Sequence, residues 1–229
     1  MNPSFENPNS ENPNSGIPIY QGQFGSFTIT EQDRQGVKFY RLGLMMAAFS
    51  VAIATLILVL DLEFTGKFLA LTVLYILLTL GLGMSLWFIH IYMAVLHRLL
   101  QGFWLVGTVA AIALALLDPA PLATTLYHQP LSILGIGFTF AALTGIYFKE
   151  AFCFDRLETK GLTAIVPILL LGHLLGILPI AVEKSLAIAW AILFLIFAFR
   201  KAMQNIPDDI GDKSVFEYLH QKRSEQRSV

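Results

Sequence analysis

Three histidines lie within the apolar stretches of the sequence, and their side chains are the ones there most suited to chemistry. His90 and His97 are seven residues apart, so about 700° of helical rotation would return them to nearly one face of a helix. His173 lies eleven residues into a later apolar stretch, which corresponds to a depth of roughly 16 Å. We therefore expect His90 and His173 to approach each other near mid-membrane. Imidazoles there could ligate haem iron, chlorophyll magnesium or a metal ion, or relay protons.

The alternative interpretation is that each histidine hydrogen-bonds a helix backbone or a neighbouring hydroxyl group. Two or three histidines spread over several helices are not a motif, and no other pattern specifies a cofactor. The packing interpretation is therefore favoured, and the cofactor content is unknown from sequence.

The densest polar stretch, YFKEAFCFDRLETK, occupies residues 147–160. Its ionisable residues are Lys149, Glu150, Cys153, Asp155, Arg156, Glu158 and Lys160. Glu150 and Cys153 are one helical turn apart, as two metal ligands would be, but a lone thiol without a CxxC motif or a nearby histidine is a weak metal signal. We interpret the stretch as an interfacial helix held by aromatic residues and ion pairs, or as a docking surface for a partner.

The composition is that of an integral membrane protein. Hydrophobic residues make up 55% of the 229 residues and charged residues only 14%, whereas soluble domains are about one quarter charged. The net charge of −1 gives no reason to expect a nucleic-acid partner. Cys153 is the only cysteine, which excludes an internal disulfide framework.

The elements that would carry these residues are about six transmembrane helices. Spanning a bilayer takes about 20 apolar residues, and the block 68–117, with Arg98 as its single formal charge, is long enough for two passes. We divide it at His97 and Arg98, its only polar point. The expected helices cover residues 42–60, 68–96, 100–117, 131–148, 162–180 and 185–199. The predicted fold is an all-α membrane bundle.

The regions flanking the bundle differ in composition. Residues 1–18 repeat the pentapeptide ENPNS, which cannot bury enough apolar surface to order itself, and we expect a disordered tail. Residues 19–41 form a cytoplasmic surface segment: a short extended or hairpin stretch, then a helix capped by Thr30. The transmembrane domain is 42–201, and a cytoplasmic tail, 202–229, carries a small amphipathic helix. No cleavable signal peptide precedes the first helix, which we expect to act as an uncleaved signal.

Small residues at helical spacing indicate close helix packing. Gly172 and Gly176 form a GxxxG motif, Ala141 and Gly145 a similar one, and Gly81 belongs with them. Signatures of nucleotide-binding loops, zinc proteases and serine hydrolases are absent, so no motif indicates an enzyme.

Several strings resemble a family of uncharacterised cyanobacterial integral membrane proteins, domain of unknown function 2301. They are YQGQFG (20–25), IHIY (89–92), LHRLL (96–100), GFTFAALTGIYFKEAFC (137–153), RLETK (156–160), LGHLLG (171–176) and DIGDKSVF (209–216). The resemblance covers roughly residues 19–219. It implies a multi-helix protein of a photosynthetic prokaryote, in the plasma membrane or the thylakoid, with no assigned activity.

Three functions remain open on this basis. The protein could be a non-catalytic component that supports assembly or stability of a larger, photosynthetic membrane complex docked on its cytoplasmic face. It could be a transporter or channel for a small solute, although a matched inverted repeat is missing. It could be a redox protein that binds haem, chlorophyll or a metal through His90, His97 and His173. Membrane lipid is a partner in every case.

The distribution of basic residues predicts that both termini are cytoplasmic. Thirteen of the 15 Lys and Arg residues fall on the side of the termini, leaving only Lys67 and Lys184 opposite. Reporter fusions at the N-terminus, near Thr124 and at the C-terminus should report inside, outside and inside. A C-terminus found outside would mean that the number of helices is odd.

Overall fold

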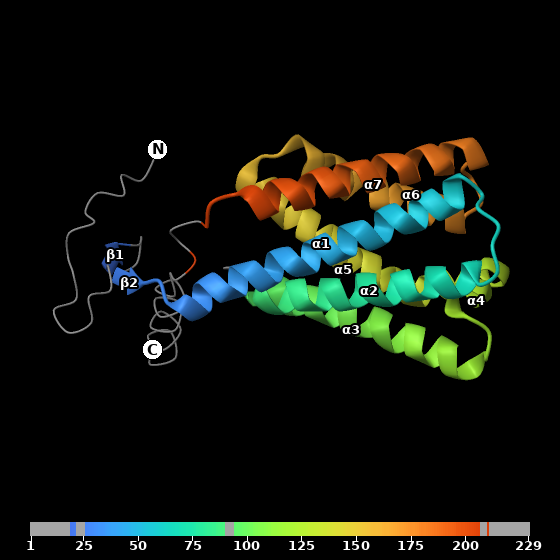
Figure 1. Cartoon of the computed structure of the whole chain (residues 1–229), viewed down its shortest axis with the longest axis horizontal. Helices are drawn as coiled ribbons and strands as arrows, with labels where there is room; N and C mark the ends of the chain where they lie inside the picture. Colours follow the sequence, from blue (N-terminus) through green and yellow to red (C-terminus); the bar gives the residue numbers. More distant parts are fainter. Residues whose placement is uncertain (1–18, 22–25, 90–93, 207–209, 211–229) are drawn as a thin grey trace, which may run out of the picture. The chain divides into compact units, whose positions relative to one another are not determined.

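The computed structural model describes residues 19–21, 26–89, 94–206 and 210, and most of these are helical (Figure 1). Six helices are long and apolar enough to cross a membrane: α1 (Glu31–Val59), α2 (Lys67–Phe88), α3 (Ala94–Leu117), α5 (Ile133–Phe154), α6 (Leu157–Leu174) and α7 (Ile180–Met203). The short helix α4 (Leu122–His128) and the 3₁₀ turn η1 (Pro130–Ser132) connect α3 to α5. The expected bundle of six transmembrane helices is confirmed. His90, the tail 1–18 and the expected helix near residues 214–223 lie outside the described residues.

A small hairpin precedes α1, as the alternating residues predicted. Strands β1 (Ile19–Gln21) and β2 (Ser26–Thr28) pair antiparallel, and Tyr20 stacks on Phe27 with 5.7 Å between ring centroids. Thr30 caps α1: the amide of Asp33 donates to the Thr30 hydroxyl at 3.2 Å, while the Asp33 carboxylate accepts from the Thr30 amide at 2.9 Å. This reciprocal pair satisfies amides that the first turn leaves without partners.

The chain divides into two compact units, and the larger one, residues 39–88 and 94–204, contains the helix bundle. Within it, α1 and α7 run antiparallel. The Arg41 guanidinium donates to the Ala202 carbonyl at 3.3 Å, and the Lys184 ammonium donates to the Val59 carbonyl at 3.4 Å. The start of α1 and the end of α7 therefore lie at one end of the bundle, here called the terminal end. The opposite end is called the distal end.

The turn between α2 and α3 was wrongly predicted. α2 ends at Phe88 and α3 begins at Ala94, so His97 and Arg98 belong to α3 instead of breaking the helix. The His97 imidazole lies 2.7 Å from the Leu86 carbonyl, near the end of α2. The last carbonyls of a helix lack intrahelical partners, and His97 satisfies one of them from the next helix. A polar residue within an apolar block can thus hydrogen-bond the end of a neighbouring helix without marking the end of its own helix.

The end of α5 and the start of α6 also differ from the prediction. Lys149 and Glu150 were expected to close the fourth transmembrane helix, but α5 continues through them to Phe154. α6 then begins at Leu157, five residues before the expected start of the fifth. The chain turns at Asp155, which adopts the left-handed conformation with φ 48°. Short polar side chains such as Asp tolerate this conformation better than most.

α6 ends earlier than predicted, at Leu174 instead of residue 180. Gly176 has φ +64°, a conformation open to glycine at little cost, and Pro179 caps the start of α7. The predicted GxxxG packing motif is therefore wrong, because Gly176 lies beyond the helix. Gly172 contacts Leu178 of the connection that follows.

Helices α1 and α2 approach each other closely at Gly43 and Gly81. A Cβ atom added to Gly81 would lie 2.6 Å from the Gly43 carbonyl oxygen and 3.1 Å from the Ala47 amide. Both neighbours are backbone atoms, which cannot move aside as a flexible side chain can. Inside a membrane the hydrophobic effect does not drive helices together, so this close contact is a main source of attraction between α1 and α2.

Gly81→Ala should therefore destabilise the protein by about 1–3 kcal/mol, the range typical of overpacking. Gly102→Ala is the matched control, since Gly102 is also helical and its added Cβ would have nothing within 4 Å. Alanine favours a helix over glycine, so the control should be neutral or stabilising. Thermal unfolding in detergent measures both variants, and equal melting temperatures would contradict the assignment.

Candidate functional site

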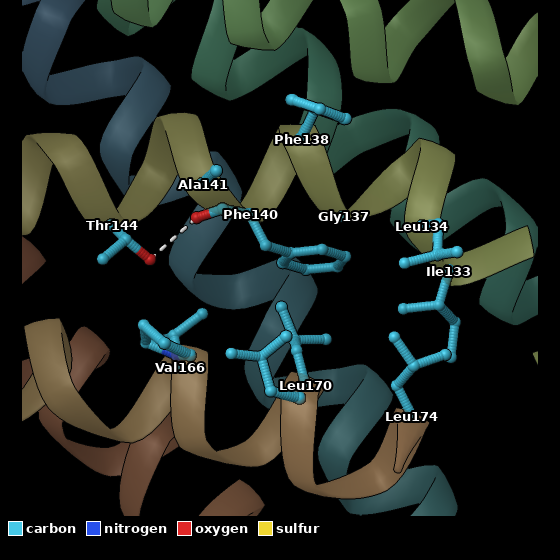
Figure 2. Close-up of a pocket in the computed structure, with 12 residues that line it drawn as sticks. Ile133, Leu134, Gly137, Phe138, Phe140, Ala141, Thr144, Val166, Leu170 and Leu174 are labelled. Atoms are coloured by element: carbon cyan, nitrogen blue, oxygen red, sulfur yellow. Dashed lines mark hydrogen bonds between the residues drawn. The ribbon is translucent and has the colours of Figure 1, made fainter. Parts of the chain in front are cut away.

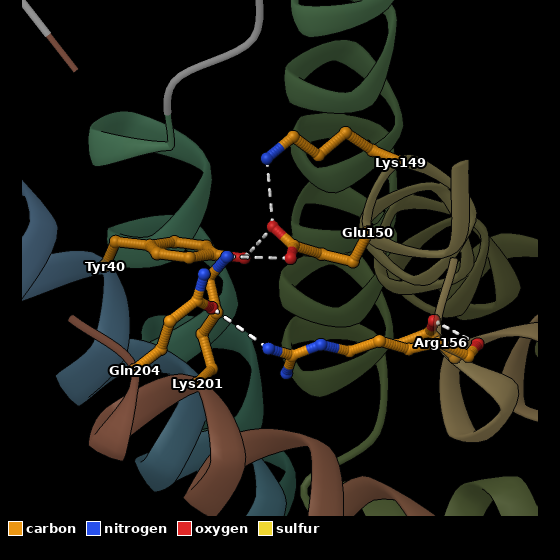
Figure 3. A network of polar contacts seen from close by, with 7 residues as sticks. Tyr40, Lys149, Glu150, Arg156, Lys201 and Gln204 are labelled. Atoms are coloured by element: carbon orange, nitrogen blue, oxygen red, sulfur yellow. Dashed lines mark hydrogen bonds and ion pairs between the residues drawn. The ribbon is translucent and has the colours of Figure 1, made fainter. Parts of the chain in front are cut away.

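A buried carboxylate, Glu150 of α5, is the centre of a polar network at the terminal end (Figure 3). The Tyr40 hydroxyl of α1 donates to Oε1 at 3.0 Å, and the ammonium of the adjacent Lys149 donates to the same oxygen at 2.9 Å. The ammonium of Lys201 on α7 donates to Oε2 at 2.8 Å. Glu150 is 0% exposed, so both oxygens are satisfied entirely by protein groups.

The network joins three helices that are far apart in sequence. Tyr40 and Glu150 are separated by 110 residues, and Glu150 and Lys201 by 51. A buried charge is costly unless it is paired and hydrogen-bonded, and removing one partner leaves the others uncompensated. The positions of α1, α5 and α7 at this end are therefore coupled through one carboxylate.

An aromatic layer lies one turn further into the bundle. Tyr147 is fully buried, with its ring 5.2 Å from Phe194 and 5.9 Å from Phe197 between centroids, both edge-on. The Trp190 indole donates to the Tyr147 hydroxyl at 3.3 Å. Edge-to-face pairs of this kind favour a fixed arrangement of the rings, and Tyr147 lies one helical turn before Glu150 on α5.

Three cations surround the ring of Phe154, the last residue of α5. The Lys201 ammonium is 4.0 Å from the ring centroid, the Lys149 ammonium 5.6 Å and the Arg156 guanidinium carbon 5.7 Å. Each distance lies within the range of a cation–π interaction. Glu150 pairs with two of these cations, Lys149 and Lys201.

The turn after α5 contributes a second set of contacts. Arg156 donates from Nη2 to the Gln204 side-chain oxygen at 3.2 Å, while its buried Nη1 has no hydrogen-bond partner in the described part of the chain. Asp155 pairs with Lys160. The hydrogen bond and charge of Lys160 lower the pKa of Asp155 below its ordinary value. Glu158 lies 2.9 Å from Arg200, but the contacting oxygen lacks hydrogen-bond geometry.

The residues predicted to form a docking loop separate into two groups. Glu150 and Glu158 are buried, and Lys149 and Arg156 are partly buried, so these four act within the bundle. The other three lie exposed on the surface: Cys153, Asp155 and Lys160. Glu150 and Cys153, although one turn apart, do not share a site.

The histidine hypothesis is only partly open to the structure, because His90 lies outside the described residues. His97 is near the start of α3 at the terminal end and contacts the Leu86 carbonyl and Gln101. His173 is in the last turn of α6 at the distal end, half exposed, with its Nδ1 2.9 Å from the Glu183 carboxylate. The expected mid-membrane depth of His173 was wrong because α6 both begins and ends earlier than predicted. Among the described residues, no three His, Cys, Asp or Glu side chains are placed to hold a metal ion.

An apolar pocket of about 360 Å³ lies between α5 and α6 (Figure 2). Its lining residues are Ile133, Leu134, Gly137, Phe138, Phe140, Ala141, Thr144, Val166, Pro167, Leu170, Leu171 and Leu174. The Thr144 hydroxyl donates to the Phe140 carbonyl at 2.8 Å, so its proton is already used. The pocket offers surface for an apolar chain and no side chain suited to catalysis.

Sequence reasoning missed Tyr40 and Lys201 as members of the network. In the sequence, Lys201 is one of the thirteen basic residues on the side of the termini, and Tyr40 carries no signal at all. The one available hint was Glu150 itself, an acid next to a long apolar stretch, which requires a partner from elsewhere. The sequence does not specify which partner, because the contacts span 110 and 51 residues.

The family model described as Uncharacterized integral membrane protein (DUF2301) matches residues 84–218. This match covers more than half of the chain, from the end of α2 through α7, and includes Glu150, Arg156 and Lys201. The chain therefore belongs to this family of integral membrane proteins. No curated protein and no solved structure shows a significant match to this chain.

Glu150→Gln should destabilise the protein by about 3–5 kcal/mol, since the buried Lys201 and the partly buried Lys149 would lose their countercharge. Thermal unfolding in detergent measures the loss. The double variant Glu150→Gln/Lys201→Met should recover part of it, because one uncompensated cation is gone.

Asp155→Asn is the control for the Glu150 variants. Asp155 also pairs with a lysine, but its side chain is 87% exposed, and Asn tolerates the left-handed conformation. Its melting temperature should match that of the wild type. A Glu150→Gln protein as stable as this control would contradict a role for the network in holding the helices.

Proposed function

We propose that this member of the family is a non-catalytic membrane component that supports assembly or stability of a larger membrane complex. The observation that carries the proposal is a set of protruding apolar side chains beside the Glu150 network. Phe152 at the end of α5 is 84% exposed, Leu157 at the start of α6 is 80% exposed, and Met203 at the end of α7 is 84% exposed. Exposed apolar groups mark contacts with lipid or with another protein, and we assign these three to a protein contact because they lie beside the network.

The network gives these side chains a fixed base. Phe152 and Met203 are each two residues from a network member, Glu150 and Lys201 respectively. A surface that is already ordered loses less conformational entropy on binding than a flexible one. The terminal end thus combines a rigid polar interior with an apolar rim, which suits a docking surface.

The distribution of charge also supports cytoplasmic termini in this proposal. Within the bundle, the terminal end carries seven basic and three acidic residues. They are Arg41, Arg98, Lys149, Arg156, Lys160, Arg200 and Lys201, and Glu150, Asp155 and Glu158. The distal end carries Lys67 and Lys184 with four acids: Asp61, Glu63, Asp118 and Glu183. An excess of Lys and Arg is typical of the cytoplasmic side.

Transport and cofactor binding receive less support from the described residues. The carboxylates and cations of the bundle are gathered near its two ends, whereas ion-coupled transporters place such groups along the pathway. His97 and His173 lie at opposite ends, so they do not form one ligand set.

The proposal predicts that apolar residues of the terminal end, and not of the distal end, hold the complex together. The triple variant Phe152→Ser/Leu157→Ser/Met203→Ser is analysed on native gels of detergent extracts from the membranes in which the protein is naturally made. It should migrate at the size of the free protein, whereas the wild type should migrate as part of a larger complex. Leu116→Ser/Leu117→Ser is the matched control, since these distal residues are 82% and 83% exposed. Both variants should retain the wild-type melting temperature. A wild-type protein that migrates only at its free size, or a triple variant that stays in the complex, would overturn the proposal.

A further inference from the structure

Among the described residues, the cations around Phe154 outnumber the carboxylates that contact them. Lys149, Lys201 and Arg156 all lie within 6 Å of one ring centroid, and Glu150 bonds the two lysines. The other two acids that the described bundle carries at this end are already paired, Asp155 with Lys160 and Glu158 with Arg200. In the described part of the chain, Arg156 therefore faces no carboxylate.

The Arg156 guanidinium is also incompletely satisfied. Figure 3 shows it extending from the turn between α5 and α6 towards Gln204 and Lys201, the end of α7. Nη2 donates to Gln204, whereas Nη1 is shielded from solvent and has no acceptor among the described residues. A buried donor without an acceptor is costly, and the fork geometry of a guanidinium suits two oxygens of one anion.

The position of this group along the bundle indicates which anion would reach it. One helix that is long and apolar enough to span a membrane ends at Phe154 and the next begins at Leu157, from which we infer that Arg156, in the turn between them, lies near the boundary of the hydrocarbon core. Lipid phosphates occupy this level of a bilayer. Basic pockets between transmembrane helices are known sites for anionic head groups.

We propose that Arg156, with Lys149 and Lys201 beside it, binds the phosphate of an anionic phospholipid at the terminal end. The phosphate supplies the countercharge that Glu150 alone does not. Its oxygens accept from the Arg156 guanidinium, which also ties the turn before α6 to the end of α7. Inorganic phosphate shares this chemistry, but only the lipid is held at this level by the membrane. The site acts on the isolated protein and does not depend on a docked partner.

The experiment compares ligands on the purified, delipidated full chain in a neutral detergent. The probes are short-chain phosphatidylglycerol, phosphatidylcholine with the same acyl chains, and inorganic phosphate, with binding followed by native mass spectrometry and by melting temperature. Phosphatidylglycerol should bind and raise the melting temperature, and phosphatidylcholine should bind at least tenfold more weakly. Both lipids carry a phosphate, but the choline cation of phosphatidylcholine is repelled by the three basic side chains, and a tenfold preference corresponds to roughly 1.4 kcal/mol.

The matched variants are Arg156→Gln and Arg98→Gln. Arg98 is an exposed arginine near the start of α3 at the same end, so its loss removes equal charge away from Phe154. Arg156→Gln should lose the preference for phosphatidylglycerol, and Arg98→Gln should keep it. If Arg156→Gln fails to fold, the comparison of lipids on the wild type still decides.

Three results would overturn the proposal. Equal binding of the two lipids would show that charge is not recognised. Inorganic phosphate matching phosphatidylglycerol would show a soluble anion site in place of a lipid site. Equal loss in both arginine variants would show a general effect of charge. Since no partner protein is present, these results are distinguishable from failure of the proposed docking function.

Discussion

A carboxylate buried within a membrane bundle persists only if cations are placed against it, and the terminal end of this protein is arranged around that requirement. Glu150 is fully buried, and its two oxygens accept from Tyr40, Lys149 and Lys201. Because these donors come from α1, α5 and α7, satisfying one charge fixes three helices relative to each other. The Tyr147 layer beneath and the Phe154 ring beside Lys201 complete the surroundings.

The same constraint explains why α5 is longer than its apolar pattern. Lys149 and Glu150 resemble a helix end when the sequence is read alone, since isolated charges belong outside the hydrocarbon core. Paired with each other and with Lys201, they are tolerated inside, and the helix continues to Phe154. The turn then moves to Asp155, and α6 starts and ends earlier. The displacement of His173 to the distal end is a consequence of this shift.

Away from the network, the helices pack through close contacts at small residues. α1 and α2 approach closely where Gly43 and Gly81 face each other, and Gly83 accommodates the Trp104 ring of α3. The sequence indicated small residues as packing sites, which is the role of Gly81, but it also selected Gly172 and Gly176. Small residues permit close approach wherever a neighbouring helix happens to lie, so their spacing alone does not identify the partner.

The sequence by itself determined the class of protein, the number of spanning helices, the hairpin before α1 and the Thr30 cap. These depend on local signals: long apolar runs, alternation, and a capping residue three positions from an acid. The turns near His97 and at Asp155 were decided by tertiary structure, because a polar residue marks a helix end only when no other helix satisfies it. The end of α6 after Leu174 instead has a local cause, the positive φ of Gly176 followed by Pro179. The Glu150 network likewise exists only in the folded chain. Its contacts join residues up to 110 positions apart, and no local pattern records which buried charge will meet which.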